Sequence, residues 1–130
     1  MKPLNELAKE IHQNNIEKGF FEEPKNIGEM LMLTVTELAE AMEADRKGHI
    51  ANVKGFTKDL SFYTGEESDF KQFFSARFED CIKNSFEDEI ADSIIRLLDL
   101  AAFKGIDIEW HISEKMKYNK TRPFKHGKNY

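Results

Sequence analysis

Long apolar runs, paired cysteines and an export signal are all missing from this chain of 130 residues. No run approaches the ~20 apolar residues that a membrane-spanning helix needs, so no membrane role is expected. The first residues lack the long apolar core and small-residue cleavage site of a signal peptide. Cys81 is the only cysteine and cannot form an internal disulfide. A cytoplasmic protein is therefore the expectation.

Several kinds of catalytic site are missing as well. Gly-x-x-x-x-Gly-Lys is absent, so a nucleoside triphosphate, if bound, is held by metal and side chains. No nucleophilic triad is apparent, because Cys81 has no histidine nearby and lies in a phenylalanine-rich stripe typical of a packed thiol. A ferritin-like di-iron site needs Glu-x-x-His pairs, and no histidine follows a glutamate by three residues.

Acidic residues outnumber basic ones over most of the chain, whereas its last residues are basic. The formal net charge is −5 at pH 7. Residues 1–114 hold all 24 acidic residues, and residues 115–130 hold six basic residues and no acidic one. This pattern suits a small polyanion bridged to carboxylates through a metal. Long nucleic acid is not expected as a partner, because it usually meets a broadly basic surface.

The apolar spacing predicts a single all-α domain over residues 1–130, a helical bundle of about four to five helices. No segment alternates apolar and polar residues as a half-buried strand would. Helices are expected at about residues 4–18, 27–47, 69–83, 85–104 and 108–120. Residues 48–68 contain three glycines and no long period, which predicts mostly loop.

Two pairs of carboxylates are the most informative feature of the sequence. Glu37-x-x-Glu40 lies in the second predicted helix, and Glu89-x-x-Asp92 lies in the fourth. Each pair projects from one face of a helical turn, so two such helices packed together would gather four anionic groups. Four carboxylates cannot stay close without a cation. Oxygen-only ligands are preferred by Mg²⁺ or Mn²⁺, and a magnesium site raises the expectation of a bound phosphate.

A solvated helix face is the ordinary interpretation of a single Glu-x-x-Glu. Two pairs on the two most apolar helices weaken that interpretation. The second pair is weaker evidence by itself, because Glu89 and Asp92 are expected opposite an apolar stripe of Ile94 and Leu98. The remaining interpretation is a magnesium site for a phosphorylated substrate, with basic residues after the last helix holding the phosphates.

A phenylalanine stripe marks the third predicted helix. Seven of the 11 phenylalanines lie between Phe56 and Phe86, and several recur at helical spacing in residues 69–83. Such a stripe is typical of a packed core or a subunit contact.

The acid motifs resemble those of a known family. Thr36-Glu-Leu-Ala-Glu-Ala-Met42 and Asp88-Glu-Ile-Ala-Asp-Ser-Ile94 are similar to the paired motifs of the MazG-like all-α nucleoside triphosphate pyrophosphohydrolases. The ending Lys115-Met-Lys-Tyr-Asn-Lys-Thr-Arg-Pro-Phe-Lys-His-Gly-Lys128 resembles the C-terminal signature of small single-domain members. Lys18-Gly-Phe20 is similar to a segment of the same group. The resemblance covers nearly the whole chain apart from residues 48–84.

The resemblance implies a Mg²⁺-dependent hydrolase that cleaves between the α- and β-phosphates of a nucleoside triphosphate, giving the monophosphate and pyrophosphate. It implies that Glu37, Glu40, Glu89 and Asp92 bind the metal, with Mn²⁺ as an alternative ion. Glu37 or Glu40 would instead orient or deprotonate the water. The residues implied to contact the phosphates, sugar or base are Lys115, Tyr118, Asn119, Arg122 and Lys128. A second subunit usually completes the bundle, which implies a homodimer or homotetramer.

The chain departs from the family pattern at one place. Forty-eight residues separate Glu40 from Glu89, more than many members have, so an inserted loop-helix segment is predicted at about residues 48–84. The insert could shape the base pocket or extend a subunit contact, which leaves the base and sugar open. Two alternatives stay open: a related enzyme acting on dUTP, dCTP or a phosphoribosyl-ATP, and a non-catalytic binding or regulatory module with the same fold.

Overall fold

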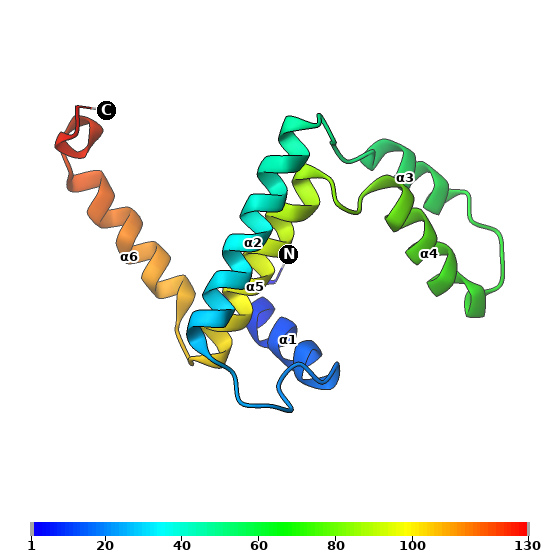
Figure 1. Ribbon diagram of the computed structural model, residues 1–130, viewed down its shortest axis with the longest axis horizontal. Coiled ribbons are helices and arrows are strands. Elements are labelled where there is room, and N and C mark those ends of the chain that lie inside the picture. The colour runs from blue at the N-terminus through cyan, green and yellow to red at the C-terminus, as the bar shows by residue number, and fades with distance from the viewer. Residues whose placement is uncertain (1, 130) are drawn as a thin grey trace. The chain divides into compact units, whose positions relative to one another are not determined.

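The computed structural model describes residues 2–129, which form six α-helices and one short 3-10 helix (Figure 1). No strand occurs within these residues, so the all-α prediction is confirmed. The number of α-helices exceeds the four to five predicted. Over the same residues, no helix combines the length and apolar character needed to cross a membrane.

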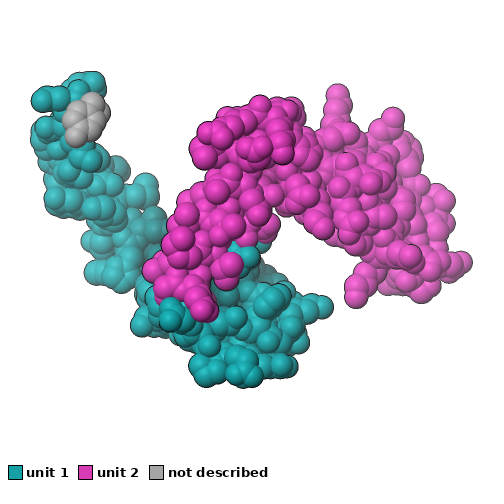
Figure 2. Space-filling model, viewed as in Figure 1, with its two compact units in different colours: residues 1–27, 95–130 teal, residues 28–94 magenta. Residues whose placement is uncertain are grey.

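The chain divides into two compact units (Figure 2). The terminal unit consists of residues 1–27 and 95–130, and the central unit consists of Gly28–Ile94. All four carboxylates of the predicted metal site belong to the central unit, whereas the predicted substrate-binding residues belong to the terminal unit.

The terminal unit contains α1 (Leu4–Glu17), the second half of α5 (Phe86–Phe103), α6 (Ile108–Thr121) and the 3-10 helix Phe124–Gly127. Asp107 caps α6, as the sequence predicted, because its Oδ1 accepts a hydrogen bond from the Trp110 N–H at 3.0 Å. Hydrogen bonds also join α1 to the start of α6: Asn5 Nδ2 donates to Asp107 Oδ1 at 2.7 Å. These contacts hold the first and last α-helices together.

The central unit contains α2 (Ile27–Arg46), α3 (Val53–Ser61), α4 (Glu67–Cys81) and the first half of α5. The prediction of mostly loop over residues 48–68 is wrong, because α3 lies there. This helix has only nine residues, too few to show a long period. Asn52 begins it by accepting a hydrogen bond from the Gly55 N–H at 2.9 Å. The segment between the acid motifs thus contains two helices, α3 and α4.

Aromatic contacts hold α3 and α4 side by side (Figure 1). The Phe56 ring of α3 lies edge-on to Phe74 and Phe78 of α4, with centroids 5.5 and 6.0 Å away. An ion pair of 2.6 Å between Arg77 and Asp59 links the same two helices. The phenylalanine stripe therefore forms the contact within this helical pair, where such rings stabilise packing beyond the area that they bury.

The buried face of α2 is small and polar, and its large apolar side chains are exposed. Thr34, Glu37, Ala41 and Ala44 are the buried residues of this helix. On α5 the sequence placed Glu89 opposite an apolar stripe that includes Ile94. In the structure Glu89 is 4% exposed and Ile94 is 50% exposed. Glu37 and Glu89 therefore lie on the inner side of the central unit, whereas Asp92 is half-buried and Glu40 is exposed.

Candidate metal centre

Small side chains on α2 and α5 surround the acid motifs. On α2, Ala41 follows Glu37 by one turn and is 3% exposed. Ser85, directly before α5, and Ser93 on α5 lie one turn before and after Glu89, and they are 0% and 3% exposed. Because these positions carry no bulky group, the longer carboxylate side chains of both helices reach the space between them.

Local hydrogen bonds begin α5 one turn before Glu89. Ser85 Oγ accepts from the Asp88 N–H at 3.2 Å, which is the cap that the sequence predicted. Asp88 in turn accepts from the Asn84 N–H at 2.9 Å. The Phe86 N–H donates to the His49 carbonyl at 2.9 Å and thereby ties the loop after α2 to the start of α5. These bonds set the register of the two acid pairs.

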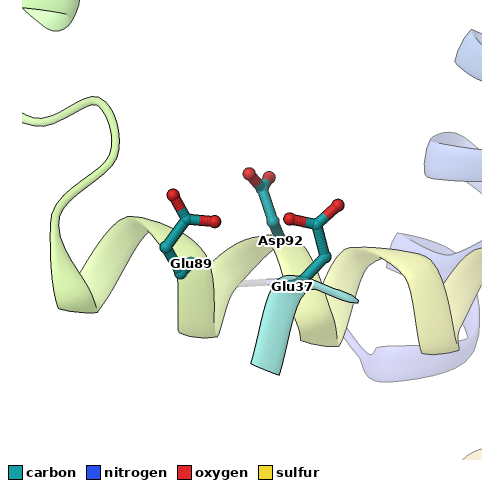
Figure 3. Close-up of side chains that lie close together, drawn as sticks. All are labelled: Glu37, Glu89 and Asp92. Carbon is teal, nitrogen blue, oxygen red and sulfur yellow. The ribbon is translucent and has the colours of Figure 1, made fainter. Parts of the chain in front are cut away.

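Glu37, Glu89 and Asp92 converge (Figure 3). Each offers a carboxylate oxygen, and the three oxygens lie within 4.8 Å of one another. Glu37 and Glu89 are 8% and 4% exposed. Oxygens on opposite sides of a Mg²⁺ ion with bonds of ~2.1 Å stand about 4.2 Å apart. Small side-chain rotations would therefore bring the three oxygens onto one ion.

The fourth carboxylate contacts this group through Glu89. The pKa of Glu89 is raised from 4.5 to about 7, mainly by burial and next by a hydrogen bond with the Glu40 side chain. The negative charges of Glu40, Glu37 and Asp92 contribute as well. Glu40 itself is exposed. All four predicted ligands therefore interact electrostatically in the metal-free protein.

The donor set suits a hard divalent cation. It consists of carboxylate oxygens, which favour Mg²⁺ or Mn²⁺ over the softer ions that prefer sulfur or imidazole. A positive ion would remove the repulsion that raises the Glu89 pKa. Glu37, Glu89 and Asp92 could hold the ion, and exposed Glu40 stands next to them.

The predicted substrate residues lie in the terminal unit and gather around one ring. Lys115 Nζ and the Arg122 guanidinium lie 4.9 and 5.8 Å from the centroid of Tyr118. Asn119 Oδ1 is buried and has no hydrogen-bond partner within residues 2–129. Lys128 is exposed and follows the 3-10 helix. The structure thus brings Lys115, Tyr118 and Arg122 together. Asn119, the next residue after Tyr118, offers its Oδ1 as a hydrogen-bond acceptor.

A cavity beside the acids contains residues that the sequence did not single out. It has a volume of about 460 Å³ and lies in the central unit. Its lining consists of Glu40, Glu43, Ala44, Lys47, His49, Asn84 and Glu89. Lys47 follows Glu40 by two helical turns, and Asn84 precedes Glu89 by five residues. Their nearness to the acid motifs is the only feature of the sequence that could have identified them as cavity residues.

A third buried carboxylate, which the sequence analysis did not single out, lies in the terminal unit. Asp99 is 8% exposed. Its Oδ1 lies 2.7 Å from His12 Nδ1, and its Oδ2 accepts from Asn15 Nδ2 at 3.0 Å. The His12 ring packs edge-on against Phe21, with centroids 4.6 Å apart. Asp99 therefore has donors from α1 on both of its oxygens.

Comparison of the chain with protein-family models, with curated proteins and with solved structures found no match.

Proposed function

We propose that this protein is a Mg²⁺-dependent nucleotide pyrophosphohydrolase of the MazG-like all-α type. The supporting observation is the convergence of Glu37, Glu89 and Asp92 from two separate motifs. Gathering buried carboxylates costs free energy, which a bound divalent ion offsets. A non-catalytic helical module has no comparable need for these groups, so the convergence favours the enzyme over that alternative.

The proposed reaction adds water across the bond between the α- and β-phosphates. A bound Mg²⁺ supplies charge that neutralises phosphoryl oxygens, and it lowers the pKa of a coordinated water. Glu37, Glu89 and Asp92 hold the ion. Glu40 is exposed and stands beside Glu89, so its carboxylate is the group that accepts a proton from the attacking water. The nucleoside monophosphate and pyrophosphate then leave as separate products.

Residues of the C-terminal segment are proposed as further substrate contacts, because they stand in the ending that resembles the family signature. Lys115, Arg122 and Lys128 carry the positive charges that phosphates require. The Tyr118 ring and the unpartnered Asn119 Oδ1 suit the sugar or base, because one offers a flat apolar face and the other an acceptor. Removal of noncanonical or excess nucleotides in the cytoplasm is the corresponding physiological role.

A second copy of this chain is proposed to cover the exposed apolar face of α2. Leu31, Val35, Leu38 and Met42 follow one another at helical spacing and are 45–52% exposed. An apolar helix of the second copy that packs on this stripe would remove its side chains from water. Sedimentation should show a homodimer or homotetramer, and Leu38→Glu should shift it toward the monomer. A wild-type monomer at every concentration would contradict this part.

The direct test of the enzyme is pyrophosphate release from a nucleotide panel that includes dUTP, dCTP and phosphoribosyl-ATP. Wild-type protein should release pyrophosphate only with Mg²⁺ or Mn²⁺ present. Glu37→Gln should lower the rate at least 100-fold and weaken Mn²⁺ binding in calorimetry, because it removes a ligand charge. Glu79→Gln is the matched control, since it removes an exposed carboxylate of the central unit away from the site.

The panel also separates the alternatives. Release from one pyrimidine nucleotide or from phosphoribosyl-ATP alone would identify the corresponding related enzyme. Metal binding without hydrolysis of any compound would favour the non-catalytic module. Equal Mn²⁺ heats for wild type and Glu37→Gln would remove the basis of the whole proposal.

A further inference from the structure

We propose that the end of α6 and the 3-10 helix after it form a binding surface for single-stranded nucleic acid (Figure 1). The surface consists of exposed bases and exposed rings: Lys117, Tyr118, Lys120, Phe124 and Lys125. Of these residues only Tyr118 is also proposed as a substrate contact. The surface is therefore a function beyond the enzyme, and it needs no metal ion.

Acidic and basic residues separate along α6. The acidic residues belong to its N-cap and first two turns, and none follows Glu114. The helix dipole favours a base in the last turn, where Lys120 lies, but it requires none beyond the end of the helix, where Lys125 and Lys128 lie. The acidic excess of the rest of the chain made long nucleic acid an unexpected partner, whereas this locally basic segment suits a short single strand.

Two aromatic rings project from the basic segment. Tyr118 is 55% exposed, and Phe124 is 88% exposed, the highest fraction for a large apolar side chain within residues 2–129. Each ring has a cation beside it: Lys115 Nζ lies 4.9 Å from the Tyr118 centroid, and Lys125 Nζ lies 5.7 Å from the Phe124 centroid. Single strands bind to such combinations, because bases stack on rings while cations contact phosphates.

The backbone after Phe124 adopts an unfavourable conformation. Lys125 and His126 both have φ of 52°, in the left-handed region that residues with a Cβ rarely adopt. The turn is closed by a hydrogen bond of 2.9 Å that the Lys128 N–H donates to the Lys125 carbonyl. Such strained residues cluster at ligand-binding segments, and here they directly follow the most exposed ring.

A single strand fits this surface better than a duplex or a membrane. The base faces of a duplex are stacked inside it, so exposed rings of the protein would gain no stacking contacts. Helices that lie on membranes keep their basic and apolar residues on opposite sides. Lys117 and Tyr118 instead lie four and three residues before Thr121, so a base and a ring share one side of α6.

The test is fluorescence anisotropy of a labelled oligothymidylate of about 15 nucleotides, titrated with the full chain in EDTA. Phe124→Ala should weaken binding at least fivefold, because it removes a ring on which one base stacks. Phe62→Ala is the matched control, since this phenylalanine of the central unit is also exposed, at 71%. The control should bind within twofold of wild type.

Salt dependence tests the basic residues. For wild type, the logarithm of the binding constant should fall with the logarithm of the KCl concentration with a slope of about −3, the value for about four phosphate contacts. The double variant Lys120→Gln/Lys125→Gln should reduce this slope by about 1.4. Lys54→Gln/Lys71→Gln is the control, because it removes two exposed bases of the central unit and should keep the wild-type slope.

Several outcomes would overturn the single-strand surface. One is equal affinity for oligothymidylate in wild type and Phe124→Ala. Another is binding of duplex DNA or of anionic lipid vesicles as tight as that of the single strand, since general charge would then explain it. Displacement of the oligonucleotide by an equal concentration of thymidine monophosphate would indicate a mononucleotide site instead. Pyrophosphate release by Lys120→Gln/Lys125→Gln should match wild type, so the enzyme and this surface fail or succeed separately.

Discussion

Two buried carboxylates in this protein have opposite surroundings. Asp99 in the terminal unit receives donors from His12 and Asn15, one on each oxygen. Glu89 in the central unit lies among other carboxylates, and burial with the Glu40 hydrogen bond raises its pKa to about 7. Their exposures are similar, at 8% and 4%. The difference therefore lies in the neighbouring groups and not in the depth of burial.

This comparison separates a buried carboxylate that the fold itself compensates from one that it surrounds with like charge. A buried charge is tolerated when hydrogen-bonded partners compensate for lost hydration. The chain provides such partners to Asp99 from α1. At Glu89 it provides further negative charge, which stabilises the protonated form and, by the same electrostatics, attracts a cation.

The largest expected effect on the free energy of unfolding is at Asp99, whose charge is compensated by residues of α1. Asp99→Ala removes the acceptor of two hydrogen bonds to a charged group, so the free energy of unfolding should fall by about 4 kcal/mol. Urea unfolding would measure the change. Asp45→Ala, at an exposed position of α2, should stay within about 0.5 kcal/mol. A similar loss in both variants would mean that Asp99 is not specially compensated.

The acid cluster should give the metal-free protein a distinctive pH dependence. Between pH 4.5 and about 7 the unfolded chain releases the Glu89 proton while the folded chain keeps it, because the folded pKa is raised. The folded state then binds more protons, so the free energy of unfolding falls as pH rises through this window. The shift corresponds to about 3 kcal/mol, complete above pH 7.

Urea unfolding in EDTA from pH 5 to 8 would measure this slope, and Glu89→Gln should remove it. Glutamine carries no titrating proton, so any slope that persists in the variant belongs to other groups. Identical pH profiles for the two proteins would show that Glu89 is not the titrating residue.

A bound metal ion should compensate the charge of Glu89, as His12 and Asn15 compensate the charge of Asp99. At 100 times its dissociation constant, Mn²⁺ should raise the free energy of unfolding of wild type by about 2.7 kcal/mol at pH 7.5. Glu89→Gln should gain less than about 0.5 kcal/mol at the same Mn²⁺ concentration, since it lacks a central ligand charge. Thermal unfolding with and without the ion measures both. An equal gain in both proteins would locate the ion elsewhere.

The smallest effect concerns a single donor to Asp99. Asn15→Ala removes one hydrogen bond and leaves His12 beside the carboxylate, so the expected loss is about 1 kcal/mol. Asn14→Ala is the control, because the preceding asparagine is exposed. Should the two alanine variants unfold at the same urea concentration, His12 alone would account for the stabilisation of Asp99.

Helix boundaries were predictable where the determining residues are local. Gly48 and Gly105 follow α2 and α5 with φ of 67° and 66°, a conformation that suits glycine because it lacks a Cβ. Ser85 and Asp107 cap the helices that they precede. The nine residues of α3 escaped prediction because so short a helix, with Gly55 inside it, offers only two and a half turns of apolar spacing.

The candidate site was predictable in its residues and only partly in its arrangement. The i, i+3 spacing identified both acid pairs, since residues three apart share a helix face. The inward face of α5 was predicted only in part: of the expected apolar stripe, Leu98 is 5% exposed but Ile94 is 50% exposed, and Glu89, expected on the opposite side, is 4% exposed. Lys47, His49 and Asn84 were missed because they meet through loop contacts over long separations in sequence.

By itself, the sequence determined that this protein is helical, where most of its helices begin and end, and which carboxylates stand in pairs. These properties follow from hydrogen bonds and side-chain spacing within a few residues. Only the tertiary structure decided that Glu37 meets Glu89 and Asp92, that Asp99 is compensated by α1, and that a cavity adjoins the acids. Those features depend on packing between distant segments, whose free energy is shared among many contacts and is not encoded in any short motif.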